Sequence, residues 1–265
     1  MKGIIKDAIR VGNSAGILLP KSWQGCKVKA ILVEKPINIK QDILKILEPY
    51  LQKILSIYIV GSYARGEARE KSDIDILAIT DGINKFICLG RYHITLVDLK
   101  IIKDQQNKEL FYLLALIREA KALLNDSLLK ELKKIKLSDK SLKWHLEMSK
   151  SALKIIKSFI KLDEIEENKI LTSPCIIYSL ILRIREAYIV DCLLRNRNYS
   201  TKELMGILTK KVSRAELEKI YESYNLVKDN REAKEKISLE MIKKLIRLLE
   251  EMLRRQEKWL KEKKD

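Results

Sequence analysis

The sequence predicts an α+β protein with an N-terminal β-hairpin unit, a mixed sheet with flanking helices and a C-terminal helical bundle. Three observations carry this prediction, one for each part. Glycine-centred turns mark residues 1–36, and short β-branched segments on both sides of a polar turn mark residues 37–136. Apolar residues at helical spacing fill residues 137–265. We expect these three ranges to be the domains.

The N-terminal part combines the run VGNSAGILLPK with an alternating stretch, CKVKAILVEK, that predicts a strand over residues 26–35. Pro36 is expected to end the unit. The pattern resembles the short swapped-hairpin DNA-binding domain of AbrB-type transcription factors. Because such a half-barrel cannot enclose a core alone, the resemblance implies a homodimer. The unit either binds DNA or packs on the rest of the chain without binding DNA; its basic residues are Lys6, Arg10, Lys21, Lys27 and Lys29.

After Pro36, a helix is expected over residues 39–53, with one apolar stripe made of Ile43, Leu44, Leu47 and Leu51. Two strands follow, over residues 54–60 and 74–80, and the run GSYARGEAREKSDIDIL joins them. Side chains on a strand alternate, so Asp73 and Asp75 share one face while Ile74 and Ile76 enter the core. Two carboxylates on one face repel each other, which favours a metal ion between them.

Gly61-Ser62, ten further residues and then Asp73-Ile74-Asp75 form a spacing that resembles the minimal nucleotidyltransferases of the DNA polymerase β superfamily. The resemblance implies that the Gly-Ser turn opens a helix that holds the phosphates of a nucleoside triphosphate. It also implies that the aspartates hold two Mg²⁺ ions and that nucleoside monophosphate is transferred while pyrophosphate leaves. ATP is the expected donor. The nucleotide-binding residues implied in this way are Gly61, Ser62, Arg65 and Ser72.

A third carboxylate is usually supplied by a later strand in that superfamily, and the candidate is Asp98 in RYHITLVDLK. The catalytic and metal-binding set is then Asp73, Asp75 and Asp98. An alternative remains for Asp98, because an aspartate that closes a strand can also start a turn. Arg65 likewise either contacts the triphosphate or pairs in the turn with Glu67 or Glu70.

Residues 108–126 repeat apolar side chains at helical spacing and are expected to form a helix on the back of the sheet. The chain has no GxxxxGK[ST] run, which argues against a P-loop ATPase. Ser62 has no GxSxG setting and histidines are nearly absent, which argues against a serine hydrolase. The scattered cysteines contain no CxxC pair, so they indicate neither a zinc site nor a disulfide framework.

The last part predicts long helices over residues 141–162, 174–196 and 238–263, with two shorter helices between the second and the third. It resembles the helical companion domains of nucleotidyltransferases, grouped with HEPN and substrate-binding domains. Neither histidine has an arginine at the spacing that HEPN ribonucleases need, so the resemblance implies no ribonuclease activity. One helix carries a polar group that either binds the acceptor or pairs within itself; the group is Arg183, Arg185, Glu186 and Tyr188.

The net charge of +17, from 53 lysines and arginines against 36 aspartates and glutamates, favours contact with polyanions, although a lysine-rich and isoleucine-rich composition also explains part of it. No stretch is long and apolar enough for a membrane span and no signal peptide is evident, so we expect a cytoplasmic protein. The sequence thus predicts an Mg²⁺-dependent nucleotidyltransferase that transfers AMP to an acceptor among proteins, RNA or small molecules. The alternative is an antitoxin-like or DNA-binding regulator that uses the same fold for binding.

Overall fold

The computed structural model describes residues 4–31, 38–70, 72–167, 169–232 and 236–262. The chain divides into two units, Met1–Ile46 and Leu47–Asp265. Each unit is described by itself.

The N-terminal unit contains the expected hairpin. Strands β1 (Ile9–Val11) and β2 (Ser14–Gly16) pair antiparallel, with Gly12 in the left-handed region at φ +59° in the turn. A short 3-10 helix, η1 (Lys21–Trp23), follows. The strand expected over residues 26–35 does not form over 26–31, because no partner strand pairs with it among the described residues. The rest of that stretch and the boundary at Pro36 lie outside the described residues.

The helix expected over residues 39–53 is shorter than predicted. Helix α1 (Ile39–Leu47) ends before Pro49, and the chain continues as a 3-10 helix, η2 (Glu48–Lys53). Proline has no N–H for an α-helical hydrogen bond and clashes with the preceding turn, which explains the break. The expected stripe is also only half right. Ile43 and Leu47 are buried, but Leu44 and Leu51 are 51% and 44% exposed.

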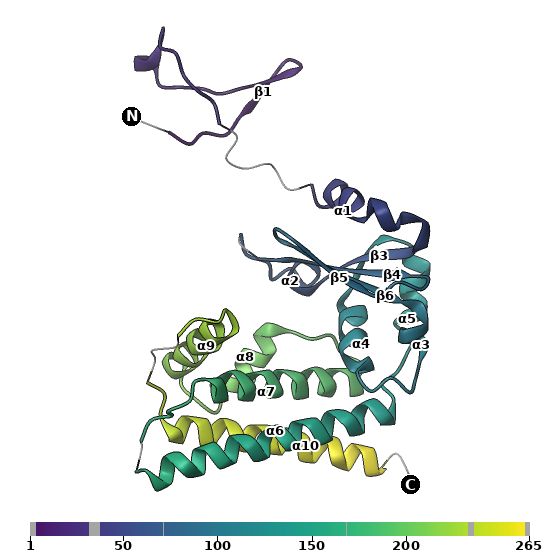
Figure 1. The fold of residues 1–265 in the computed structure, drawn as a ribbon, viewed down its shortest axis with the longest axis vertical. Helices are drawn as coiled ribbons and strands as arrows, with labels where there is room; N and C mark the ends of the chain where they lie inside the picture. The colour runs from purple at the N-terminus through teal and green to yellow at the C-terminus, as the bar shows by residue number, and fades with distance from the viewer. Residues whose placement is uncertain (1–3, 32–37, 71, 168, 233–235, 263–265) are drawn as a thin grey trace. The chain divides into compact units, whose positions relative to one another are not determined.

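A five-stranded mixed sheet forms the first half of the second unit, as expected (Figure 1). Its order is β5-β6-β4-β3-β7; β4 and β6 are parallel, and all other neighbours are antiparallel. The strands are β3 (Ile54–Val60), β4 (Ile74–Thr80), β5 (Lys85–Leu89), β6 (Tyr92–Asp98) and β7 (Lys121–Leu124). The short helix α2 (Gly61–Arg65) leaves β3 directly.

The helix expected over residues 108–126 is really a helix followed by a strand. Helix α4 (Leu110–Glu119) ends at Glu119, and the apolar residues after it form β7, which pairs with β3. Without β7, the hydrogen-bonding groups on that side of β3 would have no partner strand. Two short helices, α3 (Leu99–Lys103) and α5 (Asp126–Leu132), complete this half.

The second half of the unit is the expected helical bundle. Its three longest helices lie side by side in Figure 1 and pack on one another. The helices are α6 (Asp139–Ile165), α7 (Cys175–Leu194), α8 (Thr201–Thr209), α9 (Arg214–Lys228) and α10 (Leu239–Glu262).

Helix α4 belongs to two hydrophobic cores at once. Its residues Leu110, Phe111 and Leu114 are part of the bundle core, whereas Ile117 is part of the core between the sheet and its helices. Since all four side chains are at most 3% exposed, α4 holds the sheet and the bundle together. The end of α4, Glu119, lies at the functional site described below.

Among the described residues, no helix has the length and apolar character needed to cross a membrane.

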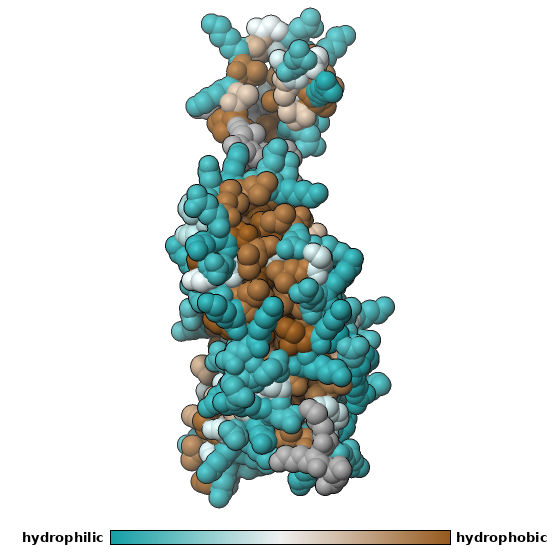
Figure 2. All heavy atoms as spheres, turned by 90° about the vertical axis from the view of Figure 1, so that its right-hand side faces the viewer, coloured by the Kyte–Doolittle hydropathy of each residue, from teal (hydrophilic) through white to brown (hydrophobic). Residues whose placement is uncertain are grey.

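Figure 2 shows apolar side chains gathered on one face of the molecule. Exposed leucines at the β3–β7 edge include Leu55 and Leu124, which are 37% and 48% exposed.

Candidate active site

The predicted carboxylate pair lies where β3 ends and β4 begins. Val60, the last residue of β3, pairs with Asp75 across the antiparallel ladder, so α2 starts directly beside this aspartate. Gly61 has φ +68°, and a Cβ at this position would lie 2.2 Å from Asp75 Oδ2. The position requires glycine for two reasons, the left-handed backbone and the contact with Asp75.

Asp73 and Asp75 face the same pocket, as the strand alternation predicted, while Ile74 and Ile76 are 0% and 1% exposed in the core. Burial raises the pKa of the Asp75 carboxyl above its ordinary value; His93 opposes the rise and the charge of Asp73 adds to it. A carboxylate whose charged form is disfavoured in this way is stabilised by a bound cation.

His93 is the residue next to this pair on the neighbouring strand. It pairs with Asp75 in the β4–β6 register, and its Nδ1 lies 3.9 Å from Asp73 Oδ2 and 3.9 Å from Asp75 Oδ1. Sequence analysis did not assign His93 to the site. A correct prediction of the register between β4 and β6 would have found it.

Asp98 is not brought to the pair, and its assignment as the third carboxylate needs correction. Asp98 pairs with Thr80 at the far end of the two parallel strands, five residues or about 16 Å along the strand from Asp75. Because Asp75 and Thr80 are an odd number of residues apart, Asp98 also lies on the opposite face of the sheet from Asp75. Its Oδ1 accepts a hydrogen bond from the Lys100 amide at 3.1 Å and caps α3. The alternative, an aspartate that starts a turn, is what the structure contains.

Arg65 pairs with two carboxylates. Its Nε donates to Glu67 Oε2 at 2.8 Å, which is one of the pairings considered from the sequence, and its Nη1 donates to Glu119 Oε2 at 2.7 Å. The other oxygen of Glu119 accepts the Gly61 amide at 2.7 Å. Glu119, which the sequence did not single out, therefore holds both the turn and the arginine. Burial raises the pKa of the Glu119 carboxyl, with Arg65 opposing the rise.

The loop before Asp73 is fixed by backbone contacts of Ser72. Its carbonyl oxygen accepts hydrogen bonds from Arg91 Nε and Nη2, and Arg91 Nη2 also donates to Tyr63 Oη at 3.0 Å. The hydroxyl of Ser72 accepts the Arg69 amide at 2.8 Å. Ser62 and Ser72 both line the pocket.

The carboxylate pair and the residues beside it line one pocket of about 450 Å³, together with Gly61, Ser62, Arg65, Ser72, His93 and Glu119. Arg185 of α7 and Phe86 of β5 also line it. Arg185 is exposed, and its guanidinium lies 5.7 Å from the centre of the Tyr199 ring. The bundle thus adds a cation to a pocket whose acidic residues come from the sheet and α4.

The polar group predicted on α7 divides into two sets. Arg183 Nη1 donates to Glu186 Oε2 at 2.6 Å, and Tyr112 Oη donates to the other oxygen of Glu186. Tyr188 is 2% exposed. Arg183 and Glu186 therefore pair with each other, which was the alternative interpretation. Tyr188 Oη instead donates to Glu203 Oε2 at 2.7 Å, outside the group, and Arg185 is the member of the group that lines the pocket.

A second contact joins the bundle to the turn after α2. Glu67 accepts hydrogen bonds from the amide and the hydroxyl of Thr201, at 3.1 and 2.7 Å. The guanidinium of Arg65 lies 5.0 Å from the centre of the Tyr199 ring. Residues at and just before the start of α8 therefore hold the arginine of the candidate site in place.

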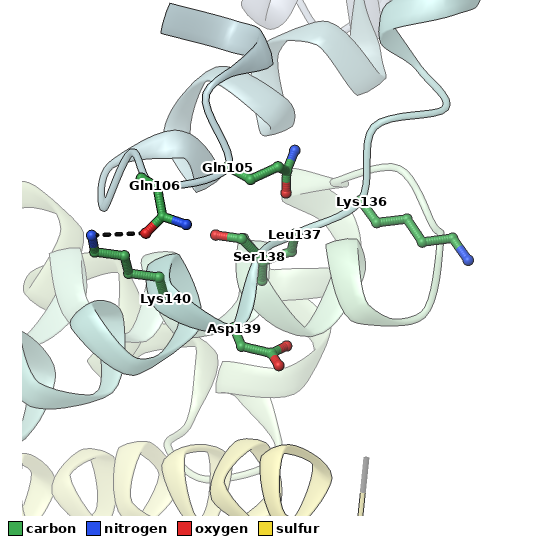
Figure 3. A pocket seen from close by; sticks show the side chains of 7 residues that line it. All are labelled: Gln105, Gln106, Lys136, Leu137, Ser138, Asp139 and Lys140. Carbon is green, nitrogen blue, oxygen red and sulfur yellow. Dashed lines mark hydrogen bonds between the residues drawn. The ribbon is translucent and has the colours of Figure 1, made fainter. Parts of the chain in front are cut away.

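A different cavity, of about 460 Å³, lies where the chain enters α6 (Figure 3). Lys140 Nζ donates to Gln106 Oε1 at 3.0 Å across it, and Lys136 extends away from Lys140. Because no carboxylate pair or arginine lines this cavity, the candidate site is the pocket around Asp73 and Asp75.

Asp73 and Asp75 fit the Mg²⁺ expected from the sequence, but they fill only part of its coordination. Within the described ranges, no group of three or more His, Cys, Asp or Glu side chains is arranged to hold a metal ion. Mg²⁺ is commonly bound by one or two carboxylates together with substrate phosphates and water. The pair therefore suits an ion that arrives with a nucleotide.

The match to a family model includes the residues of this pocket that come from the sheet and α4. No curated protein matches the chain significantly. Among solved structures, the chain is similar to a nucleotidyltransferase-like protein from Exiguobacterium sibiricum 255-15, with 12% identity, 82% of this chain and 75% of that chain covered, and a TM-score of 0.35. The family model described as nucleotidyltransferase domain matches residues 40–171 and supports nucleotidyl transfer as a general activity. The stretch that holds the sheet and the carboxylate pair is therefore similar to nucleotidyltransferase domains.

Proposed function

We propose that this protein transfers nucleoside monophosphate from a nucleoside triphosphate, with ATP as the donor, to an acceptor hydroxyl. The observation that carries the proposal is the pair Asp73 and Asp75 on one face of β4, directly beside the Gly61-Ser62 turn. In this proposal residues 37–136 bind the nucleotide and residues 137–265 form the bundle that faces it.

Asp73 and Asp75 would hold Mg²⁺ together with the phosphates of the nucleotide. When bound, the metal neutralises the phosphate charge and activates the attacking and leaving oxygens of an in-line displacement. Burial and the charge of Asp73 both disfavour the charged form of Asp75. A bound cation would offset both effects, which supports this role for the pair.

The triphosphate would lie against Ser62, Ser72, Arg65 and Arg185, which line one pocket. Arg185 is the better candidate for a direct phosphate contact, since it is positively charged and forms no ion pair among the described contacts. Arg65 shares its charge with Glu67 and Glu119, so it acts mainly by holding the turn beside Asp75. Planar guanidinium groups are well suited to phosphate oxygens.

The test is transfer of label from α-³²P-ATP. With Mg²⁺ and a lysate, we expect one discrete acceptor to become labelled, whether a protein, an RNA or a small molecule. Asp73→Asn should abolish the label, because loss of metal-supported charge stabilisation lowers rates by orders of magnitude. A label that persists in Asp73→Asn, or no label with any nucleoside triphosphate, contradicts the proposal.

A second candidate is an antitoxin-like or DNA-binding regulator that acts as a homodimer through the N-terminal unit. The hairpin β1–β2 and the net charge of +17 favour it. A regulator should shift its own upstream DNA with sequence preference over competitor DNA. Non-specific attraction should instead weaken steeply with salt and discriminate poorly among sequences. Both functions can reside in one chain, so the two assays are read separately.

A further inference from the structure

Phe86 is an exposed aromatic side chain at the edge of the candidate site. It lies on β5, the outer strand of the sheet, and is 61% exposed. An exposed phenylalanine alone is ordinary on a protein surface. This one also lines the pocket that contains Asp73 and Asp75, which sets it apart from the other exposed apolar residues.

The register of the sheet puts Phe86 on the same face as the carboxylates. Phe86 pairs with Thr95 on β6, and Thr95 pairs with Leu77 on β4, two residues after Asp75. Paired residues point to one face, so the Phe86 ring and the Asp75 carboxylate project to the same side. The rings of Phe86 and His93 are 6.0 Å apart between centroids.

The two ends of the pocket differ in chemistry. On the β3 side of Asp75 lie the α2 residues Ser62 and Arg65, which suit phosphates. On the β6 side lie His93 and then Phe86, two strands or about 10 Å from β4. A nucleotide whose β- and γ-phosphates lie at α2 and whose α-phosphate lies at the carboxylates must extend its sugar and base in the other direction, over β6 toward β5.

We propose that Phe86 is the stacking platform for the nucleobase of the bound nucleoside triphosphate. This inference rests on the proposed function, because it takes the phosphate end of the ligand as given. An aromatic ring stacks on every base, since every base has a π-face. The platform therefore supplies affinity for a nucleotide over a bare polyphosphate and discriminates only modestly among bases.

The test compares ATP with inorganic tripolyphosphate, which has the phosphates and lacks the base. Calorimetric titrations with Mg²⁺ would use the full chain, Phe86→Ala and the control Phe86→Tyr, which keeps the ring. We expect Phe86→Ala to weaken ATP binding roughly 5- to 150-fold, the range known for loss of base stacking on an aromatic residue. Tripolyphosphate binding should not change, and Phe86→Tyr should bind ATP as the wild type does.

Three outcomes overturn the inference. Unchanged ATP affinity in Phe86→Ala shows that the base does not stack on this ring. If label transfer nevertheless falls in that variant, the ring contacts the acceptor. Equal weakening of ATP and tripolyphosphate indicates a general disturbance of the pocket instead of lost stacking. A wild-type chain that binds neither ligand refutes the proposed function itself, which separates that failure from a failure at Phe86.

Discussion

The carboxylate of Glu119 joins two parts of the site, because one oxygen accepts the Gly61 amide and the other accepts Arg65 Nη1, each at 2.7 Å. The side chain of Glu119 is 6% exposed and that of Arg65 is 15% exposed. Since α4 also packs in both hydrophobic cores, this residue links the position of the Gly-Ser turn to the packing of the sheet on the bundle.

Replacing this carboxylate should destabilise the fold. Glu119→Gln keeps an acceptor for Gly61 but removes the charge opposite Arg65, and we expect a loss of about 1.5–3 kcal/mol, the range for hydrogen bonds to charged groups. Urea unfolding measures it. Glu70→Gln is the matched control on the exposed part of the turn and should change stability by less than about 0.5 kcal/mol. Equal stability of the two variants would refute the role given to Glu119.

Alanine variants at two glycines distinguish the effect of backbone strain from the effect of contact with Asp75. Gly61 and Gly82 have φ +68° and +84°, but only at Gly61 would a Cβ meet another atom, Asp75 Oδ2 at 2.2 Å. Alanine should destabilise at both positions by about 1–2 kcal/mol for the left-handed backbone. Only Gly61→Ala should also lose Mg²⁺-dependent ATP binding, because Asp75 must rotate away. Titrations in which both variants bind ATP equally well would contradict the contact.

Stability should depend on pH through the buried His145. Burial lowers the pKa of His145 to about 4, while its Nε2 lies 3.2 Å from Gln256 Oε1. The unfolded chain therefore binds a proton at higher pH than the folded chain. The resulting stability, about 3 kcal/mol, is fully present above pH 6.5 and is lost as the pH falls toward 4. Chemical unfolding of His145→Asn should show a smaller loss over this interval, and an identical loss in both proteins would refute the assignment.

Arg183 and Arg185 lie on the same helix and should behave oppositely. Arg185→Gln is expected to weaken ATP binding about tenfold, as for loss of one charge-assisted contact, with little change in melting temperature. Arg183→Gln leaves Glu186 buried without its charged partner and should lower stability by about 3 kcal/mol. Melting curves and ATP titrations of both variants check this. If Arg185→Gln bound ATP normally, the phosphate role of Arg185 would be wrong.

Local patterns in the sequence correctly predicted that Asp73 and Asp75 face the same side, because strand alternation depends only on neighbouring residues. The prediction that Asp98 joins the pair was wrong, because the distance between them depends on the register between β4 and β6. Alternation along one strand does not determine that register. The same register places His93 beside Asp75, and the sequence analysis did not assign His93 to the site.

The end of α4 shows a related difficulty. Residues 110–124 are mostly apolar, and helical spacing alone did not reveal that α4 ends at Glu119 and that β7 pairs with β3. The sequence did not single out Glu119, because its two partners come from positions 54 and 58 residues earlier in the chain.

The most direct test of the central claim is a calorimetric titration of ATP with and without Mg²⁺ for the wild type and for the double variant Asp73→Asn, Asp75→Asn. We predict that the wild type binds ATP with Mg²⁺ and nearly loses binding without it. The double variant should lose binding in both conditions while melting at or above the wild-type temperature, because removal of two repelling charges relieves strain. Equal ATP affinity of the two proteins in the presence of Mg²⁺ would contradict the assignment of Asp73 and Asp75 as the nucleotide and metal site.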